Sequence, residues 1–414
     1  MKRLFLGGLV LLCLLDLSMC AKNGENNASY SFRIYDEAGI TIAETAGGPK
    51  YSEELFHYEE LLRLVEDPEN DDSILVRPGT IYCDEAGFYY VLDFSDNRIA
   101  VFNSAGNYVR SFGQKGQGPG EFTQITATLI WSDIINIFDS SLNRATRYQT
   151  DGTLLDVTTV PPSILRAQDM HLLEDGTMLL HHWVTSEDDD AQFMQRRLLS
   201  LSPERDTLWV VETSVVQTML KTRISSGMPL AFGYPFAGSP ELIYHPAHGI
   251  LVSNGIEPEL HEYDITGRLI RKIRLELDPV PFTAEDMAKV KAPYEEQLQN
   301  SREQGQSRII ELNEALIQAV KFPNFHPVWR DMIQSDEGYL WLRVVEHSAD
   351  RDARGGGYIF RVLSPEGEYL GESRMPYGPN FTLSGDRLLT VWYPPDAEDY
   401  QLLVCRIVPA VSGL

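Results

Sequence analysis

The sequence predicts an all-β protein, a six-bladed β-propeller with four-stranded blades and a helical insertion between blades 4 and 5. Three observations support this prediction. One segment recurs after 46 residues, each copy alternates short strand-like runs with turn residues, and the chain length divides into six such units. Four-stranded units that recur about every 40–50 residues are typical of propeller blades.

The repeat is clearest where residues 92–106 align with residues 138–152. Five pairs of identical residues mark the alignment: Asp93 with Asp139, Ser95 with Ser141, Asn97 with Asn143, Arg98 with Arg144, and Gly106 with Gly152. A single active site needs unique residues, whereas every blade needs the same turn and the same contacts with its neighbour. We therefore interpret these repeated residues as structural, and we expect them not to touch a ligand.

The blade count follows from length. Residues 78–410 contain an insertion at 282–329, and the remainder gives about 47 residues to each of six blades. The last unit lacks a clear fourth strand, which residues 39–44 or 61–65 could supply. Closing the ring with strands from both termini would remove the exposed sheet edges that favour aggregation.

The insertion has a helical pattern. Thr283 is suited to cap a helix whose first turn contains Glu285 and Asp286, and Gly305 is expected to separate two helices. Its role stays open between a hairpin that covers one propeller face and a lid or partner-binding arm.

A glycine-rich stretch at residues 112–122 follows the first copy of the repeat. It does not fit a phosphate-binding loop, because Lys115 is followed by neither Ser nor Thr and no helix follows. We interpret it as the connection from the outer strand of one blade to the inner strand of the next. Its structural residues are Gly113, Gly116, Gly118, Pro119, Gly120 and Phe122, and we expect Gly118 to occupy a backbone position where a side chain is costly.

Taken together, Asp93, Asn97, Arg98 and the stretch from Gly106 to Phe122 resemble an NHL repeat, and more closely the six-bladed propeller lipoproteins of that superfamily. The resemblance is specific over residues 78–122 and moderate over 123–155. Beyond that it depends on pattern and on the end of the insertion, Phe-Pro-Asn-Phe-His-Pro at 322–327. It implies a propeller and an exported protein, and it supplies no reaction.

The N-terminus has a basic start and a short apolar run, which together predict a signal peptide over residues 1–20. Leu-Ser-Met-Cys at residues 17–20 resembles a lipoprotein cleavage site, with Cys20 as the lipidated first residue. Residues 21–29 would then be a tether and residues 30–414 the propeller. This predicts a location in the cell envelope, lipid-anchored in the outer membrane or on the periplasmic side. The alternative is ordinary cleavage that releases a secreted or periplasmic product.

Charge and composition narrow the partners. The chain has 35 Lys and Arg against 60 Asp and Glu, a net charge of −25, which disfavours nucleic acid and leaves the lipid anchor as the only membrane contact. Cys83 and Cys405 are expected to be buried and unpaired. The nine histidines have no metal-ligand spacing, so we expect no cofactor, metal or catalytic residue.

Two functions of different classes remain. The favoured hypothesis is a scaffold that binds a protein, peptide or glycan without catalysis. The alternative is an NHL-type propeller lyase or lactone hydrolase with a metal in the central channel, where His171, His248 and His326 would have to converge. Fold alone does not decide between them.

Overall fold

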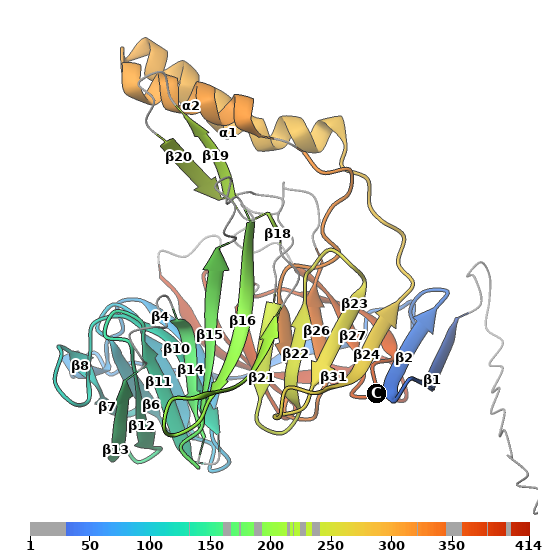
Figure 1. The fold of residues 1–414 in the computed structure, drawn as a ribbon. Helices are drawn as coiled ribbons and strands as arrows, with labels where there is room; N and C mark the ends of the chain where they lie inside the picture. Colours follow the sequence, from blue (N-terminus) through green and yellow to red (C-terminus); the bar gives the residue numbers. More distant parts are fainter. Residues whose placement is uncertain are drawn as a thin grey trace, which may run out of the picture.

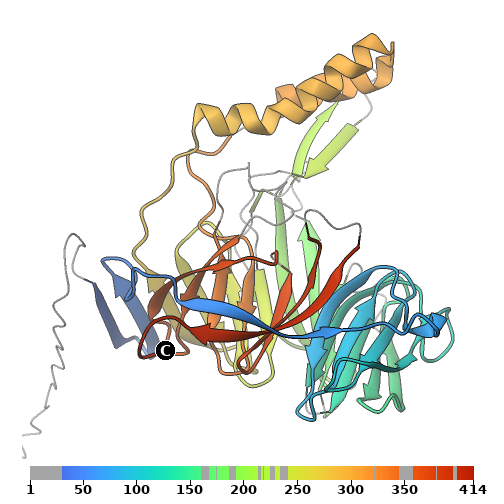
Figure 2. The same cartoon turned by 180° about the vertical axis from the view of Figure 1, so that it is seen from behind.

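The computed structural model describes residues 30–131, 133–159, 167–173, 175–185, 193–212, 216–217, 219–223, 229–233, 241–320, 322–344, 358–378, 380–394 and 399–414. The predicted signal peptide, Cys20 and the tether lie outside these residues. The described strands form six successive up-and-down sheets, which are the blades of a six-bladed β-propeller (Figures 1 and 2). The predicted fold class is confirmed.

Blades 1 and 2 contain the two clearest copies of the repeat. Blade 1 consists of β4 (Pro78–Cys83), β5 (Tyr89–Asp93), β6 (Arg98–Phe102) and β7 (Tyr108–Phe112). Blade 2 consists of β10 (Ile125–Trp131), β11 (Ile134–Asp139), β12 (Arg144–Gln149) and β13 (Leu154–Thr159). Tyr89 pairs with Phe102, and 46 residues later Ile135 pairs with Tyr148, so the strands of both blades share one register.

The short strands β8 (Gln114–Lys115) and β9 (Glu121–Phe122) pair in parallel within the glycine-rich connection between these blades.

Blades 3 and 4 depart more from the repeat. Blade 3 consists of β14 (Ala167–Leu172), β15 (Met178–Thr185), β16 (Phe193–Leu201) and β17 (Thr207–Glu212), and β18 (Val216–Gln217) also pairs with β16. Blade 4 consists of β21 (Glu241–His245), β22 (Gly249–Ser253), β23 (Glu259–Tyr263) and β24 (Leu269–Leu275). The hairpin of β19 (Met219–Arg223) and β20 (Pro229–Gly233) lies in the connection between these blades.

Blades 5 and 6 complete the ring. Blade 5 consists of β25 (Met332–Gln334), β26 (Leu340–Arg343), β27 (Tyr358–Leu363) and β28 (Tyr369–Met375). Blade 6 consists of β29 (Phe381–Ser384), β30 (Arg387–Trp392), β31 (Gln401–Pro409) and the N-terminal strand β3 (Phe56–Leu64).

β3 pairs antiparallel with β31, so the second of the two predicted closing segments supplies the missing strand. The first predicted segment has another place: β2 (Ile40–Ala46) pairs in parallel with β24 and, with β1 (Ser31–Glu37), widens blade 4 to six strands.

The first strand of each blade is at the inner end of its sheet. The inner strands of neighbouring blades contact one another, as β10 does with β14, β21 with β25 and β25 with β29. The turns that follow these inner strands come together on one face of the ring, which we call the channel mouth. Figure 1 shows the β21–β22 turn on this face, on the side of the ring away from the helices.

The insertion folds as α1 (Ala284–Glu303) and α2 (Ser307–Ala319) between blades 4 and 5, as predicted. Thr283 Oγ1 accepts from the Asp286 backbone N–H at 3.2 Å, and the Asp286 carboxylate accepts from the Thr283 backbone N–H at 2.8 Å. This reciprocal cap starts α1. The two helices extend away from the blades, and α2 packs against β19 (Figures 1 and 2). Neither described helix has the length and apolar composition needed to cross a bilayer.

The core consists of apolar layers between neighbouring blades. Phe138 of blade 2 packs with Met170 of blade 3, and Phe102 of blade 1 packs with Leu389 of blade 6. All four side chains are almost fully buried. The closed ring is therefore held by contacts of the same kind all the way around, with the turns left free to vary.

Candidate functional site: the channel mouth

The repeated aspartates bind the chain segments that enter blades 1 and 2. Asp93 accepts from the backbone N–H groups of Val76 at 3.0 Å and Arg77 at 3.1 Å. Asp139 accepts from Thr123 at 2.6 Å and Gln124 at 3.2 Å. Both carboxylates are fully buried, so neither faces solvent at the surface.

The repeated arginines hold the preceding connection. Arg144 donates through Nη1 to the Gln117 carbonyl oxygen at 2.9 Å and through Nη2 to that of Gly118 at 2.7 Å. Arg98 donates in the same way to the carbonyl oxygens of Asp72 and Ile74, in the segment before blade 1. Each guanidinium thus fastens the irregular chain that leads into its own blade.

The repeated asparagines have left-handed backbone conformations, with φ of 51° at Asn97 and 47° at Asn143. Asparagine tolerates this region better than most residues, which explains its place in the turn. Asn97 is 6% exposed, and its amide nitrogen donates to the Thr123 carbonyl oxygen at 3.1 Å. Asn97 and Lys115 also line a surface depression of 440 Å³. The Asn97 amide is already hydrogen-bonded to Thr123 there, so it is not free to bind a ligand.

The glycines of the motif serve different purposes. Gly106 has φ of 82°, and a Cβ there would lie 2.6 Å from the Arg63 carbonyl oxygen. Gly152, its counterpart in blade 2, has φ of 92°. The expectation for Gly118 is wrong: its backbone is outside the left-handed region, and a Cβ would meet only the flexible end of Glu121, at 3.1 Å. Gly120 is the glycine where a side chain would be costly: its φ is 77°, and a Cβ there would lie 2.8 Å from Tyr148 Oη.

The rest of the connection packs between blades 1 and 2. Phe122 is fully buried beside Gly113, where a Cβ would lie 3.0 Å from the Phe122 ring. Gly116 and Pro119 lie in the same connection, and the Gly118 backbone N–H donates to Glu121 Oε2 at 2.8 Å. These contacts explain the glycine-rich motif by its packing between two blades.

Residues that do not repeat line the channel mouth. The turns after β4, β10, β25 and β29 enclose a cavity of 370 Å³, which we call the acidic cavity. Its carboxylates are Asp84, Glu85, Asp133 and Asp336, and the described residues that line it include no Lys or Arg. Asp84 is held in place by the Tyr90 hydroxyl at 2.7 Å. The Arg387 guanidinium lies beside Cys83, with Nη1 3.9 Å from Sγ, but the four carboxylates outnumber it, so the cavity is negative overall.

A second depression of 280 Å³ adjoins the acidic cavity, and we call it the aromatic groove. Its rings come from Trp131, His171 and Tyr244, and its aliphatic walls from Leu129, Ile134, Leu172, Leu173 and Pro246. Trp131 lines both depressions and is 37% exposed. Its ring stands edge-on to that of His245, with 5.2 Å between centroids, so blades 2 and 4 meet across the mouth.

Asn136 lies on β11 and lines the aromatic groove with Arg147. It is 9% exposed, and its Oδ1 is buried without a hydrogen-bond partner among the described residues. Arg147 is engaged by Asp156, with Nε 3.0 Å from Oδ2. A buried oxygen without a donor is unusual in folded proteins.

Two histidines connect blades 4 and 5 at the mouth. His245 Nε2 lies 3.4 Å from Asp336 Oδ1, and its Nδ1 accepts from the Ala247 backbone N–H at 3.2 Å. The neutral ring therefore has its proton on Nε2 and donates it to Asp336. His248 stacks on His245 and donates from Nε2 to the Asp336 carbonyl oxygen at 2.7 Å. In this arrangement His245 offers no vacant nitrogen to accept a proton from a substrate.

The three histidines of the metal hypothesis have different surroundings. His171 lies beside His181 and Tyr244, His248 beside Asp336, and His326 Nε2 is 3.3 Å from Asp286 Oδ2 at the base of the insertion. Within the described part of the chain, no three His, Cys, Asp or Glu side chains are grouped closely enough to hold a metal ion.

The two cysteines within the described residues, Cys83 and Cys405, are both free, and they differ in exposure. Cys405 on β31 is fully buried, as expected, whereas Cys83 on β4 is only half-buried and lines the acidic cavity. Cys83 was expected to be buried, but the open mouth leaves the end of its inner strand accessible. Burial raises the pKa of both thiols, and at Cys83 the nearby Arg387 guanidinium partly opposes this.

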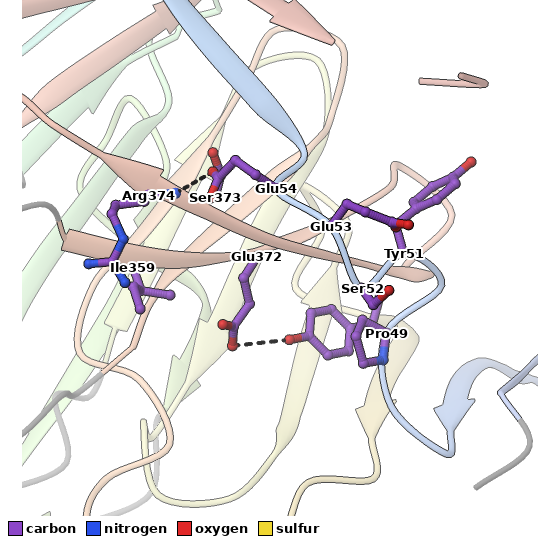
Figure 3. Close-up of a pocket in the computed structure, with 10 residues that line it drawn as sticks. Pro49, Tyr51, Ser52, Glu53, Glu54, Ile359, Glu372, Ser373 and Arg374 are labelled. Carbon is purple, nitrogen blue, oxygen red and sulfur yellow. Dashed lines mark hydrogen bonds between the residues drawn. The ribbon is translucent and has the colours of Figure 1, made fainter. Parts of the chain in front are cut away.

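A further pocket of 380 Å³ lies on the outside of blade 5, between β28 and residues 49–54 (Figure 3). Here the N-terminal segment adds to the edge of the blade. The backbone N–H groups of Lys50 and Tyr51 donate to the carbonyl oxygens of Tyr369 and Leu370, and Glu54 Oε1 accepts from the Arg374 N–H at 2.6 Å. We interpret this pocket as a seam that covers an edge strand.

Sequence reasoning did not identify the residues of the mouth. Trp131, Asn136 and Asp336 belong to no motif and differ from blade to blade. The available signal was their position, since each lies on or next to one of the first two strands of a blade, near the turn between them. The helical insertion, whose role the sequence left open between a cover and a partner-binding arm, supplies none of the described residues that line these two depressions.

Comparison with known proteins supports the fold. A family model described as "6-bladed beta-propeller" matches residues 68–209, about a third of the chain. A Bacteroides fragilis protein thought to be exported is similar in structure, with a TM-score of 0.53 and 12% identity over 89% of this chain and 100% of that chain. A DUF4221 family member from Bacteroides vulgatus has a TM-score of 0.51 and 10% identity over 85% of this chain and 98% of that chain.

The virginiamycin B lyase of Staphylococcus aureus covers 85% of this chain and 99% of its own at 10% identity, but its TM-score of 0.38 is too low to bear on function. No curated protein sequence is significantly similar to this chain.

Proposed function

We propose that this protein is an exported, membrane-tethered propeller that binds a protein, peptide or glycan at the channel mouth without catalysis. The observation that carries the proposal is the pair of depressions that meet at Trp131. They are built from residues that do not repeat, whereas the repeated residues are taken up by contacts within the fold. Open sites with an aromatic wall and nearby charged groups are typical of recognition surfaces.

Export and tethering are supported by the N-terminal sequence, with its basic start, short apolar run and Cys20. The resemblance of residues 93–122 to an NHL repeat of propeller lipoproteins agrees with this location, as does the exported character ascribed to the Bacteroides fragilis protein of the same fold. A tether of residues 21–29 would hold the propeller close to the membrane while leaving its faces accessible.

The second candidate function is a propeller lyase or hydrolase. The observation in its favour is the His245–Asp336 pair, 3.4 Å apart at the edge of the acidic cavity. A histidine oriented by a carboxylate is a common general base. Here, however, both nitrogens of the neutral His245 ring are engaged, so the binding function is better supported.

The test is a comparison of full-length protein, extracted in detergent, with its Trp131→Ala variant in capture experiments on envelope extract. We expect the parent to retain a ligand that the variant loses, and we expect mass spectrometry to recover the ligand chemically intact after prolonged incubation. Recovery of a cleaved or eliminated product would favour the enzyme instead. Equal retention by parent and variant would place binding elsewhere on the molecule.

A further inference from the structure

We infer that the channel mouth binds an extended peptide that places an apolar side chain in the aromatic groove and a lysine or arginine in the acidic cavity. This inference rests on the proposed binding function and specifies its ligand. It starts from Trp131, which is a wall of both depressions. A ligand that fills both must carry two unlike groups close together.

The acidic cavity favours a cation. Glu85, Asp133 and Asp336 are exposed, and the Tyr90 hydroxyl and the Phe88 backbone N–H hold both Asp84 carboxylate oxygens in position. An ammonium or guanidinium group would be attracted to these carboxylates, and an anionic ligand would be repelled. The net charge of −25 reinforces this preference at longer range.

The aromatic groove favours an apolar side chain. Most of its lining is aliphatic or aromatic, including Leu129, Leu173 and Pro246. These groups gain by excluding water from an apolar partner, and they offer few hydrogen bonds to the hydroxyl groups of a sugar. A leucine, methionine or aromatic side chain suits this surface.

Asn136 supplies the third element. It lines the groove and is 9% exposed, so its side-chain amide can pair with a ligand that brings an N–H group there. A peptide carries a backbone N–H beside every side chain. A lipid chain offers no such donor, and a neutral glycan offers no cation for the acidic cavity.

The shared wall also limits the spacing of the two groups. In an extended peptide, side chains i and i+2 emerge on the same side about 7 Å apart, so they can lie on either side of one indole ring. The expected ligand therefore has an apolar residue two positions from a basic residue.

The experiment is an array of acetylated octapeptides that pair Leu or Phe with Lys or Arg at spacings of one to four residues, with Ser and Glu replacements. The full-length chain in detergent is applied to it and to a glycan array. We expect binding to peptides with spacing two, weakened by salt. We expect about tenfold weaker binding for Asp133→Asn combined with Asp336→Asn, and a similar loss for Trp131→Ala.

The controls are Glu295→Gln on α1 and Leu208→Ala on β17, both exposed and away from the mouth, and both should bind like the parent. Asp133 has φ of 61°, which asparagine tolerates, so Asp133→Asn should fold normally even if Trp131→Ala does not. Binding that ignores peptide charge, or prefers Glu, would overturn the inference.

Glycan binding that depends on Trp131, with no peptide binding, would overturn the peptide inference and leave the proposed binding function in place. Ligand binding that depends on no mouth residue would overturn both.

Discussion

Arg144 Nη2 lies 2.7 Å from the carbonyl oxygen of Gly118, and through this contact blade 2 holds the connection that enters it. The same guanidinium also reaches the carbonyl oxygen of Gln117, at 2.9 Å. Arg98 has the equivalent relationship with residues 72 and 74 ahead of blade 1. The arginine at this position of the repeat therefore makes the same contact in both blades, binding the backbone of the preceding connection. This indicates a role in stability.

Arg144→Ala should destabilise the protein by about 2–3 kcal/mol, because it removes several charge-assisted hydrogen bonds from a buried site and leaves carbonyl oxygens without a donor. Arg144 is only 9% exposed. The measurement is chemical denaturation, with Arg268→Ala as the control, since the Arg268 side chain is 77% exposed. Ligand binding in the folded fraction should be unchanged. A variant with parental stability and lost binding would show that the repeat carries function.

Gly120→Ala should cost about 2–3 kcal/mol, because it combines a left-handed backbone with a collision at Tyr148. Two matched substitutions separate these causes. Gly39→Ala also has a left-handed backbone, φ of 85°, but open space around it, and should cost about 1 kcal/mol. Gly118→Ala has neither problem and should cost about 0.5 kcal/mol or less. Equal melting temperatures for all three variants would contradict this explanation.

The fold was predictable because its signals are local and repeated. The 46-residue offset between Asp93 and Asp139 can be read directly from the sequence. The turns that it predicts are determined by residues close together in the chain. The blades that the N-terminal strands join were only partly predictable. β2 and β3 both have strand-like sequences, and only the packing against β24 and β31 assigns each to its blade.

Glu259 gives stability a specific pH dependence. Burial raises the pKa of its carboxyl, but hydrogen bonds from Arg274, His261 and Lys272 outweigh burial and bring the pKa down to about 2. A lowered pKa means that the stabilisation is complete above about pH 4.5 and is lost as the pH falls towards 2.

Glu259→Gln should therefore lower stability at pH 7 by about 1 kcal/mol, a value reduced by solvent screening of this partly exposed cluster. The difference from the parent should shrink between pH 4.5 and 2. Thermal melts across this range measure it, with the exposed Glu204→Gln as control. A difference that stays constant down to pH 2 would show that the ion pairs are not its source.

The channel mouth was much less predictable than the fold. Trp131 and His245 are 114 residues apart in the chain and meet only because the ring brings the turns of blades 2 and 4 together. Neither residue belongs to a motif, because the residues of the mouth differ from blade to blade while the structural residues repeat. Only the placement of the blades around the ring makes these residues neighbours.

The two thiols should differ in reactivity. Cys405 is fully buried and should react with iodoacetamide only after unfolding, whereas the half-buried Cys83 should react slowly in the native protein. The raised pKa of Cys83 keeps the thiolate scarce near pH 7, so its labelling rate should still be rising with pH at pH 9, where an ordinary thiol is already half ionised. Peptide mapping after timed labelling measures both rates. A disulfide between them in a non-reducing map would contradict this prediction.

Lipidation at Cys20 is the prediction on which tethering depends. A thioether-linked lipid on the first mature residue would keep the chain in the membrane fraction, and one lipid chain alone gives only weak anchoring, so more than one acyl chain is expected. Cys20→Ala should therefore lose the label from a fatty-acid probe and move to the soluble fraction. Cys83→Ala is the matched control, because it removes a cysteine of the folded propeller and should leave both label and fractionation unchanged. An unmodified residue 20 or 21 at the mature N-terminus, found by mass spectrometry, would show ordinary secretory cleavage. The propeller would then meet its ligand as a free protein.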